Sequence, residues 1–225
     1  MKVKDLSLSE RPREHALQDG IEALSNRELI AILLRSGTRK RSALEIADDV
    51  LNQSGNLGEL GVSSIHSLMK IEGIKEAKAL ELQAAFELGR RISFEKVKQK
   101  GYVNQPQDIV DWLNQQIGFA GQEHFIVLFL DQQNKIESYK TMFKGTMTSA
   151  SVHPREIYKE ALAKGCAKII CVHNHPSGNT EPSPADIAVT KAIEECGRIT
   201  SIPLLDHIIV GKNSYTSFRQ NQLID

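Results

Sequence analysis

Two histidines and one aspartate have the residue types and the spacing of metal ligands. His173 and His175 follow the apolar run 169–172, which predicts a buried strand. Side chains two positions apart on a strand point to the same face, so two imidazoles can converge on one ion. Ser183 is the expected N-cap of a helix that carries Asp186 in its first turn. Two neutral nitrogens and one carboxylate match a catalytic zinc site whose fourth position is left for water.

Each of these residues also has an ordinary structural interpretation. A His-x-His pair is common, and Ser183 with Asp186 can simply cap a helix. The complete pattern is more specific: His-x-His-Pro, six residues, Ser, two residues and Asp. It resembles the JAMM (MPN+) metalloprotease motif, and the stretch His-Asn-His-Pro-Ser-Gly resembles the RadC-like branch of that superfamily. The resemblance implies a zinc-dependent hydrolase with the α/β architecture of MPN domains, a mixed β-sheet flanked by helices in a cytidine deaminase-like fold.

Metal-assisted peptide hydrolysis also needs a group that takes a proton and returns it to the leaving amine. In the JAMM family this group is a glutamate at the start of an early strand, and the resemblance places Glu123 in that role. Its ordinary interpretation is an exposed carboxylate at a strand edge, and Glu156 and Glu181 are alternative bases. Ser183 matches the family serine whose hydroxyl stabilises the oxyanion, a role that competes with capping the helix.

Two further residues near the motif are interpreted structurally. Cys171 has the same strand parity as His173 and His175, but we expect a small buried side chain rather than a ligand. His207 lies in the apolar run 204–210, where we expect a packed or hydrogen-bonded histidine rather than a fourth ligand.

Composition limits the classes of function. The chain has 225 residues, of which 40% are hydrophobic and 25% charged, an ordinary globular balance. Lys+Arg and Asp+Glu number 28 each, so no global field attracts nucleic acid or acidic membranes. No apolar stretch approaches the roughly 18 residues of a membrane span, and the N-terminus has no signal-peptide core. The 3 cysteines lack zinc-ribbon or redox spacing, so we expect a cytoplasmic protein.

Residues 1–98 predict an all-α domain. Ser25 and Ser42 each begin a capping-box pattern. The later turn around Gly73 joins two helices and resembles a helix-hairpin-helix element, whose free N–H groups suit a DNA phosphate. The usual second glycine of that element is Lys75 here, and residues 1–100 carry 17 basic and 15 acidic side chains. We therefore interpret the hairpin chiefly as a packing element and expect weak DNA binding at most.

Residues 103–225 form the expected second domain, which the resemblance assigns to the MPN/JAMM type. The charged segment 93–104 is interpreted as the linker that precedes it. Hydrophobic periodicity and turn residues predict the elements of this domain. The expected strands are 124–130, 135–143, 146–152, 169–172 and 204–210, and the expected helices are 106–117, 154–164 and 184–197.

Two functions follow from these patterns. The first is a zinc metallopeptidase or isopeptidase that acts on a peptide or protein substrate through Glu123 and water. The second is a DNA-associated protein whose metal domain is a scaffold. The complete ligand set His173, His175 and Asp186, together with a candidate base, favours the first.

Overall fold

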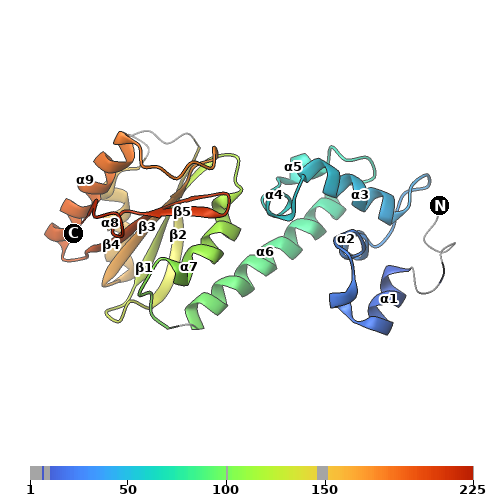
Figure 1. The fold of residues 1–225 in the computed structure, drawn as a ribbon, viewed down its shortest axis with the longest axis horizontal. Helices are drawn as coiled ribbons and strands as arrows, with labels where there is room; N and C mark the ends of the chain where they lie inside the picture. Colours follow the sequence, from blue (N-terminus) through green and yellow to red (C-terminus); the bar gives the residue numbers. More distant parts are fainter. Residues whose placement is uncertain (1–6, 8–10, 100, 146–151, 225) are drawn as a thin grey trace. The chain divides into compact units, whose positions relative to one another are not determined.

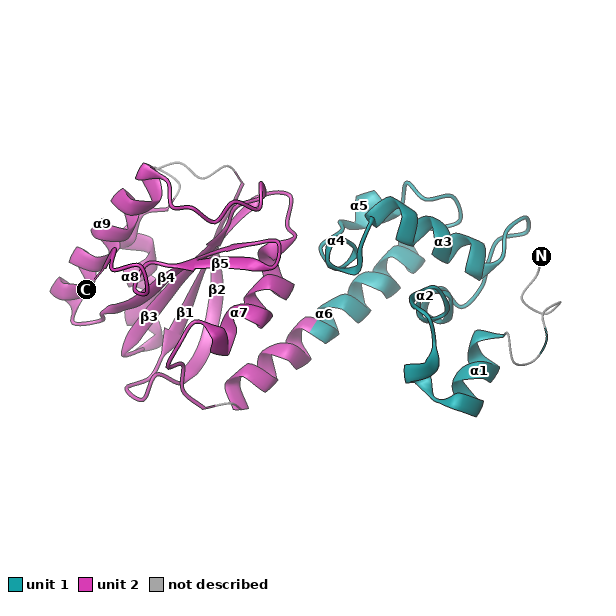
Figure 2. Cartoon of the chain, viewed as in Figure 1, with its two compact units in different colours: residues 1–89 teal, residues 90–225 magenta. Residues whose placement is uncertain are grey.

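The structure is a computed structural model that describes residues 7, 11–99, 101–145 and 152–224 (Figure 1). The chain divides into two compact units, residues 1–89 and residues 90–225 (Figure 2). The described part of the first unit is helical, and the second unit contains the sheet. The all-α region followed by an α/β domain is therefore confirmed.

The helices of the first unit begin where the sequence places their caps. Ser25 and Ser42 each accept a hydrogen bond from the backbone three residues later, and Glu28 and Glu45 bond back to the serine N–H groups. Both predicted capping boxes are therefore present. The helices with residues in this unit are α1 (Pro12–Asp19), α2 (Asn26–Leu34), α3 (Ala43–Ser54), α4 (Leu57–Gly61), α5 (Ile65–Leu68) and α6 (Glu76–Gln99), with a short 3₁₀ turn at Ile21–Ala23.

The hairpin between α5 and α6 packs on the core of this unit. Gly73 has a positive φ of 95°, and a Cβ at this position would lie 2.7 Å from the Ile46 side chain. The flanking Ile71 and Ile74 are both buried. Close approach to α3 therefore accounts for the glycine without any ligand.

The second unit is built on a five-stranded sheet in the order β2-β1-β3-β4-β5. Strands β3 and β4 are parallel, and the other neighbours are antiparallel, so the sheet is mixed as predicted. The short edge strand β5 was not predicted, because four residues are too few to show a period. The expected strand 146–152 lies outside the described residues except for Val152. The strands are β1 (Glu123–Leu130), β2 (Ile136–Gly145), β3 (Lys168–Asn174), β4 (Leu204–Gly211) and β5 (Ser214–Ser217).

Helices cover both faces of this sheet (Figure 1). Helices α8 (Pro154–Lys164) and α9 (Pro184–Thr200) pack on the face that carries Phe125 and Cys171. Helix α7 (Gln107–Leu113) and the π-helical turn Asn114–Gly118 pack on the opposite face. The metal motif therefore lies between β3 and α9.

Residues 93–99 of the expected linker are helical and continue α6. Phe94 and Val97 pack against the core on the α7 face of the sheet. The Phe94 ring lies 5.0 Å from Trp112 and 4.7 Å from Tyr139, measured between centroids. These contacts with residues distant in sequence bury the apolar side chains of a segment that otherwise reads as charged. Among the helices of the described residues, none combines the length and apolar character needed to cross a bilayer.

Candidate metal centre

The two histidines of the motif stand at the end of β3, on the side covered by α9. His173 belongs to the strand and is fully buried. The N–H of His175 donates to the carbonyl of Val210 at 3.1 Å, so pairing with β4 continues one residue past the strand. The two Nε2 atoms lie 3.1 Å apart. The strand alternation predicted from sequence is therefore what brings the two rings together.

Asp186 reaches the same point from the first turn of α9. Its Oδ1 lies 3.2 Å from Nε2 of His173, and its Oδ2 lies 3.5 Å from Nε2 of His175. Candidate ligand atoms of the three residues all lie within 4.8 Å of one another, and no other such group of His, Cys, Asp or Glu occurs among the described residues. Ligand atoms about 2.0–2.1 Å from a tetrahedral zinc would be about 3.3–3.4 Å apart, so the donor set and its spacing fit zinc.

Ser183 holds Asp186 in place through a capping box. The N–H and Oγ of Ser183 both donate to Oδ2 of Asp186, at 2.8 and 2.6 Å, and the Asp186 N–H donates to Oγ at 3.2 Å. The carboxylate is only 1% exposed. Asp186 is thus both the capping-box acid of α9 and a candidate ligand, and the Ser183 hydroxyl proton is directed to it.

The charge states of the cluster suit metal coordination. Burial opposes ionisation of Asp186, but the adjacent His173 and His175 rings and the hydrogen bonds from Ser183 outweigh it and hold its pKa well below the usual range. Burial lowers the pKa of His173. The pKa of His175 is raised, first by its hydrogen bond to Asp186 and to a smaller extent by the charge of Glu123. An ionised carboxylate and neutral imidazoles are the forms that bind metal. Of the two candidate ligand histidines, His175 retains its second proton to higher pH.

Glu123 begins β1 on the same face of the sheet as the histidines. Phe125 pairs with His173 across the antiparallel ladder, with ring centroids 6.1 Å apart. Glu123 precedes Phe125 by two positions, so it has the same strand parity and lies toward the candidate ligands His173, His175 and Asp186. Its charge raises the pKa of both His173 and His175 as a minor contribution.

Asn174 ties the backbone around Glu123 to the strand that carries the ligands. Its Oδ1 accepts from the His124 N–H at 2.7 Å, and its Nδ2 donates to the Gln122 carbonyl at 3.1 Å. These two groups flank Glu123 on either side. The side chain is fully buried, and it also donates to the carbonyl of Ala120. Sequence reasoning missed this residue, although a polar residue between the two histidines was the available signal.

The alternative candidates lie elsewhere or have other partners. Glu156 pairs with Arg155 at 3.1 Å on an exposed surface. Glu181 is exposed in the loop before α9. Cys171 is fully buried in the core, and burial raises the pKa of its thiol, as expected for a structural side chain. His207 packs behind His173 with its Nε2 2.8 Å from Nδ1 of that ring, so it contacts a candidate ligand rather than joining the group.

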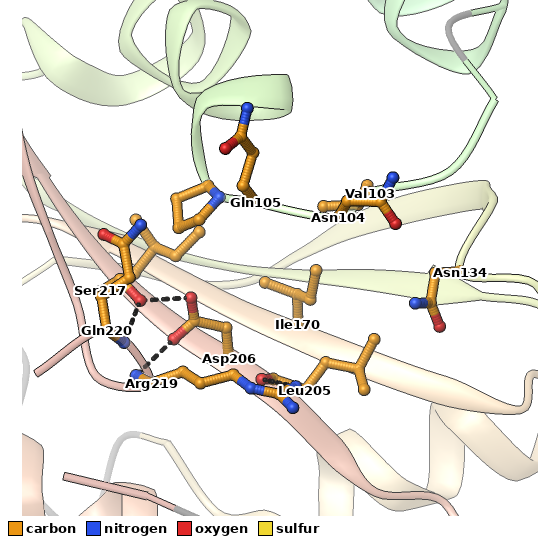
Figure 3. A pocket seen from close by; sticks show the side chains of 12 residues that line it. Val103, Asn104, Gln105, Asn134, Ile170, Leu205, Asp206, Ser217, Arg219 and Gln220 are labelled. Carbon is orange, nitrogen blue, oxygen red and sulfur yellow. Dashed lines mark hydrogen bonds between the residues drawn. The ribbon is translucent and has the colours of Figure 1, made fainter. Parts of the chain in front are cut away.

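A cavity of about 390 Å³ lies on the α7 face of the sheet, away from the candidate metal ligands (Figure 3). Asp206 lines it beside β5, and burial raises the pKa of this carboxyl. Its oxygens accept from the Ser217 hydroxyl at 2.6 Å and from the Arg219 N–H at 3.0 Å. Asp206 therefore anchors the C-terminal segment to β4. The cavity contains none of the candidate site residues.

Comparison with known proteins matches both parts of the chain. Residues 103–223 match the family model described as RadC-like JAB domain, and residues 3–80 match the one described as UPF0758 N-terminal. A UPF0758 protein of Shouchella clausii is 43% identical over 218 residues, which is 97% of this chain and 95% of that protein. A UPF0758 protein of Bacillus cereus is 42% identical over 218 residues, which is 97% of each chain. These names state no activity.

Proposed function

Because the chain belongs to the RadC-like JAB-domain family, we propose that it is a zinc-dependent hydrolase of the metallopeptidase or isopeptidase type. The observation that carries the proposal is the convergence of His173, His175 and Asp186 on one point at zinc-ligand spacing. Such a site has three protein ligands, which leaves a position for water or substrate, as in catalytic zinc sites. Its substrate is a peptide or a protein.

The residues around the ligands have distinct roles in this proposal. A bound zinc would lower the pKa of water to about 7 and polarise the carbonyl of the scissile bond. Glu123 takes a proton from the attacking water and passes it to the leaving amine. Asn174 keeps the peptide groups on either side of Glu123 fixed to β3. The strand register and this clamp support the assignment of the base.

Ser183 has two roles that exclude each other at any moment. In the structure its hydroxyl proton goes to Asp186, which orients a ligand. Donation to an oxyanion requires the hydroxyl to turn away from that carboxylate. We assign Ser183 the orienting role, because its hydroxyl already donates to the Asp186 carboxylate at 2.6 Å.

Zinc content is the first test of the proposal. Protein purified without added metal should contain about one zinc per chain by elemental analysis. The double substitution His173→Ala with His175→Ala should empty the site. A double variant that retains its zinc would refute the ligand assignment.

Activity is the second test. Zinc-loaded protein is incubated with a peptide library and with isopeptide-linked substrates. Glu123→Gln should reduce hydrolysis about 10²–10⁴-fold with unchanged zinc content, because glutamine keeps the size but cannot take the proton. Glu156→Gln is the matched control and should leave the rate unchanged. Full activity of Glu123→Gln would move the base to another carboxylate.

A second function, weak nucleic-acid binding by the first unit, has one specific observation in its favour. A cavity of about 490 Å³ in this unit is lined by four arginines: Arg11, Arg13, Arg35 and Arg41. Guanidinium groups suit phosphate, but Arg35 and Arg41 are already paired with Glu81 and Asp49. We therefore propose salt-sensitive, sequence-independent binding only. Titration of a labelled duplex against the full chain tests it, and nanomolar binding at physiological salt would contradict it.

A further inference from the structure

Three hydrogen bonds connect α9, β4 and β3 behind the candidate metal ligands. The Thr190 hydroxyl lies 2.5 Å from the backbone carbonyl oxygen of Asp186 and 2.6 Å from Nδ1 of His207. Nε2 of His207 lies 2.8 Å from Nδ1 of His173. Thr190, His207 and His173 are each at most 1% exposed. The chain of bonds therefore runs through the protein interior and ends on a candidate ligand.

Counting protons gives one arrangement in which each of the three bonds has a donor and an acceptor. The Asp186 carbonyl can only accept, so it takes the single hydroxyl proton of Thr190. The Thr190 oxygen then accepts from His207, whose Nδ1 must carry its proton. In neutral His207 the Nε2 atom is left as an acceptor, so it receives the Nδ1 proton of His173. Nε2 of His173 is then bare and faces His175 and Asp186.

The same atoms permit one reversed arrangement. Thr190 would then donate to His207, His207 to Nδ1 of His173, and Nε2–H of His173 to the Asp186 carboxylate. That arrangement places lone pairs of the Thr190 hydroxyl and the Asp186 carbonyl against each other at 2.5 Å. A buried contact of this length between two acceptors is unfavourable, whereas a hydroxyl proton between them makes a good hydrogen bond. The first arrangement leaves the bare Nε2 of His173 3.2 Å from Oδ1 of Asp186 and 3.1 Å from Nε2 of His175. These contacts are longer, and they surround the position of the proposed metal ion, which would bind the same lone pairs.

We propose that Thr190 and His207 are positioning residues that hold His173 as the Nδ1–H tautomer and so present a bare Nε2 to the metal. This inference rests on the proposed metal site. A hydrogen-bond partner on the nitrogen that does not bind the metal fixes both the tautomer and the ring orientation of a ligating histidine. His175 has a simpler partner for the same purpose, because its Nδ1 lies 2.7 Å from the carbonyl of Asn179. The chain of hydrogen bonds that begins at Nδ1 of His173 therefore ends at the backbone carbonyl of Asp186. The carboxylate of Asp186 is the ligand next to His173 in the proposed site.

The tautomer is measured directly in metal-free, full-length protein with ¹⁵N-labelled histidine. Long-range ¹H–¹⁵N correlation spectra at about pH 9, where free imidazoles are neutral, distinguish Nδ1–H from Nε2–H. Wild type should show Nδ1–H at both His173 and His207. Thr190→Val keeps the shape but removes the hydroxyl, so His173 should move toward Nε2–H, and Thr190→Ser should keep the wild-type pattern. An Nε2–H His173 in wild type would overturn the proposal.

Zinc affinity, measured by competition with a chelator, is the second readout. Thr190→Val and His207→Phe should each weaken zinc binding about 10–100-fold, and Thr190→Ser should bind as wild type does. Equal affinities of Thr190→Val and Thr190→Ser would refute the positioning role. The serine and valine variants share one site, so they decide the matter even where His207→Phe does not fold. If wild type binds no zinc, the proposed site fails, and the tautomer spectra still judge this inference by themselves.

Discussion

Replacing Ser183 with alanine separates the orienting role of its hydroxyl from an oxyanion role. The change removes two of the three hydrogen bonds of the capping box: Oγ no longer donates to Oδ2 of Asp186 or accepts from its N–H. The third bond, from the Ser183 N–H to Oδ2, remains. The carboxylate stays buried beside the histidines with one fewer donor. Both the start of α9 and the position of a candidate metal ligand are therefore affected.

The expected loss of stability follows from these two bonds. Loss of a serine N-cap costs about 0.5–2 kcal/mol, and a hydrogen bond to a charged group contributes about 1.5–3 kcal/mol. The two overlap in one side chain and the remaining bond compensates in part, so we expect about 1–2 kcal/mol. For a chain of this size that corresponds to a decrease in melting temperature of roughly 2–8 °C. Trp112, the one tryptophan in the sequence, is buried in the second unit, so its fluorescence reports the unit that contains the site.

Zinc affinity and rate then distinguish the two roles. If Ser183 orients Asp186, Ser183→Ala binds zinc more weakly, and saturating zinc restores the turnover rate. If it serves the oxyanion, the rate falls about 10²–10³-fold at full zinc occupancy. Ser25→Ala removes an equivalent capping box from the first unit and is the matched control, with zinc affinity unchanged. Unchanged melting and zinc affinity with a lost rate would refute the orienting role.

Three further predictions follow from the site and the fold. Asn174→Ala should leave zinc content unchanged and lower turnover about tenfold or more, because Glu123 loses the clamp on both sides; normal turnover would contradict that role. Zinc affinity should be highest above the raised pKa of His175 and should fall as pH drops through it, because a proton on His175 competes with the metal. Titration calorimetry at a series of pH values should place the start of this fall above the ordinary histidine pKa of about 6.5; a fall that starts only below that value would contradict the shift. Gly73→Ala should destabilise the first unit by about 1–3 kcal/mol without changing zinc affinity, because its Cβ would meet Ile46 at a positive φ; unchanged unfolding by circular dichroism would contradict the packing role.

The parts of the fold that sequence predicts are those encoded by neighbouring residues. The capping boxes at Ser25 and Ser42 and the apolar run before His173 depend on contacts within a few positions, and all three are present. The helical continuation through 93–99 depends instead on Trp112 and Tyr139, which are distant in sequence. The charged composition of that segment predicts a linker, because its aromatic partners lie too far away in the sequence to contribute to a local pattern.

The same distinction separates the ligands from the residues that support them. The candidate ligands have a fixed spacing, because strand alternation places the two histidines on one face and a capping box places Asp186 in the first turn of α9. Their supports have no such spacing. Thr190 and His207 reach His173 only because α9 packs on β4 and β4 runs parallel to β3. A motif can therefore reveal which atoms could bind a metal, whereas the side chains that hydrogen-bond to those atoms are brought there by tertiary contacts that no local pattern encodes.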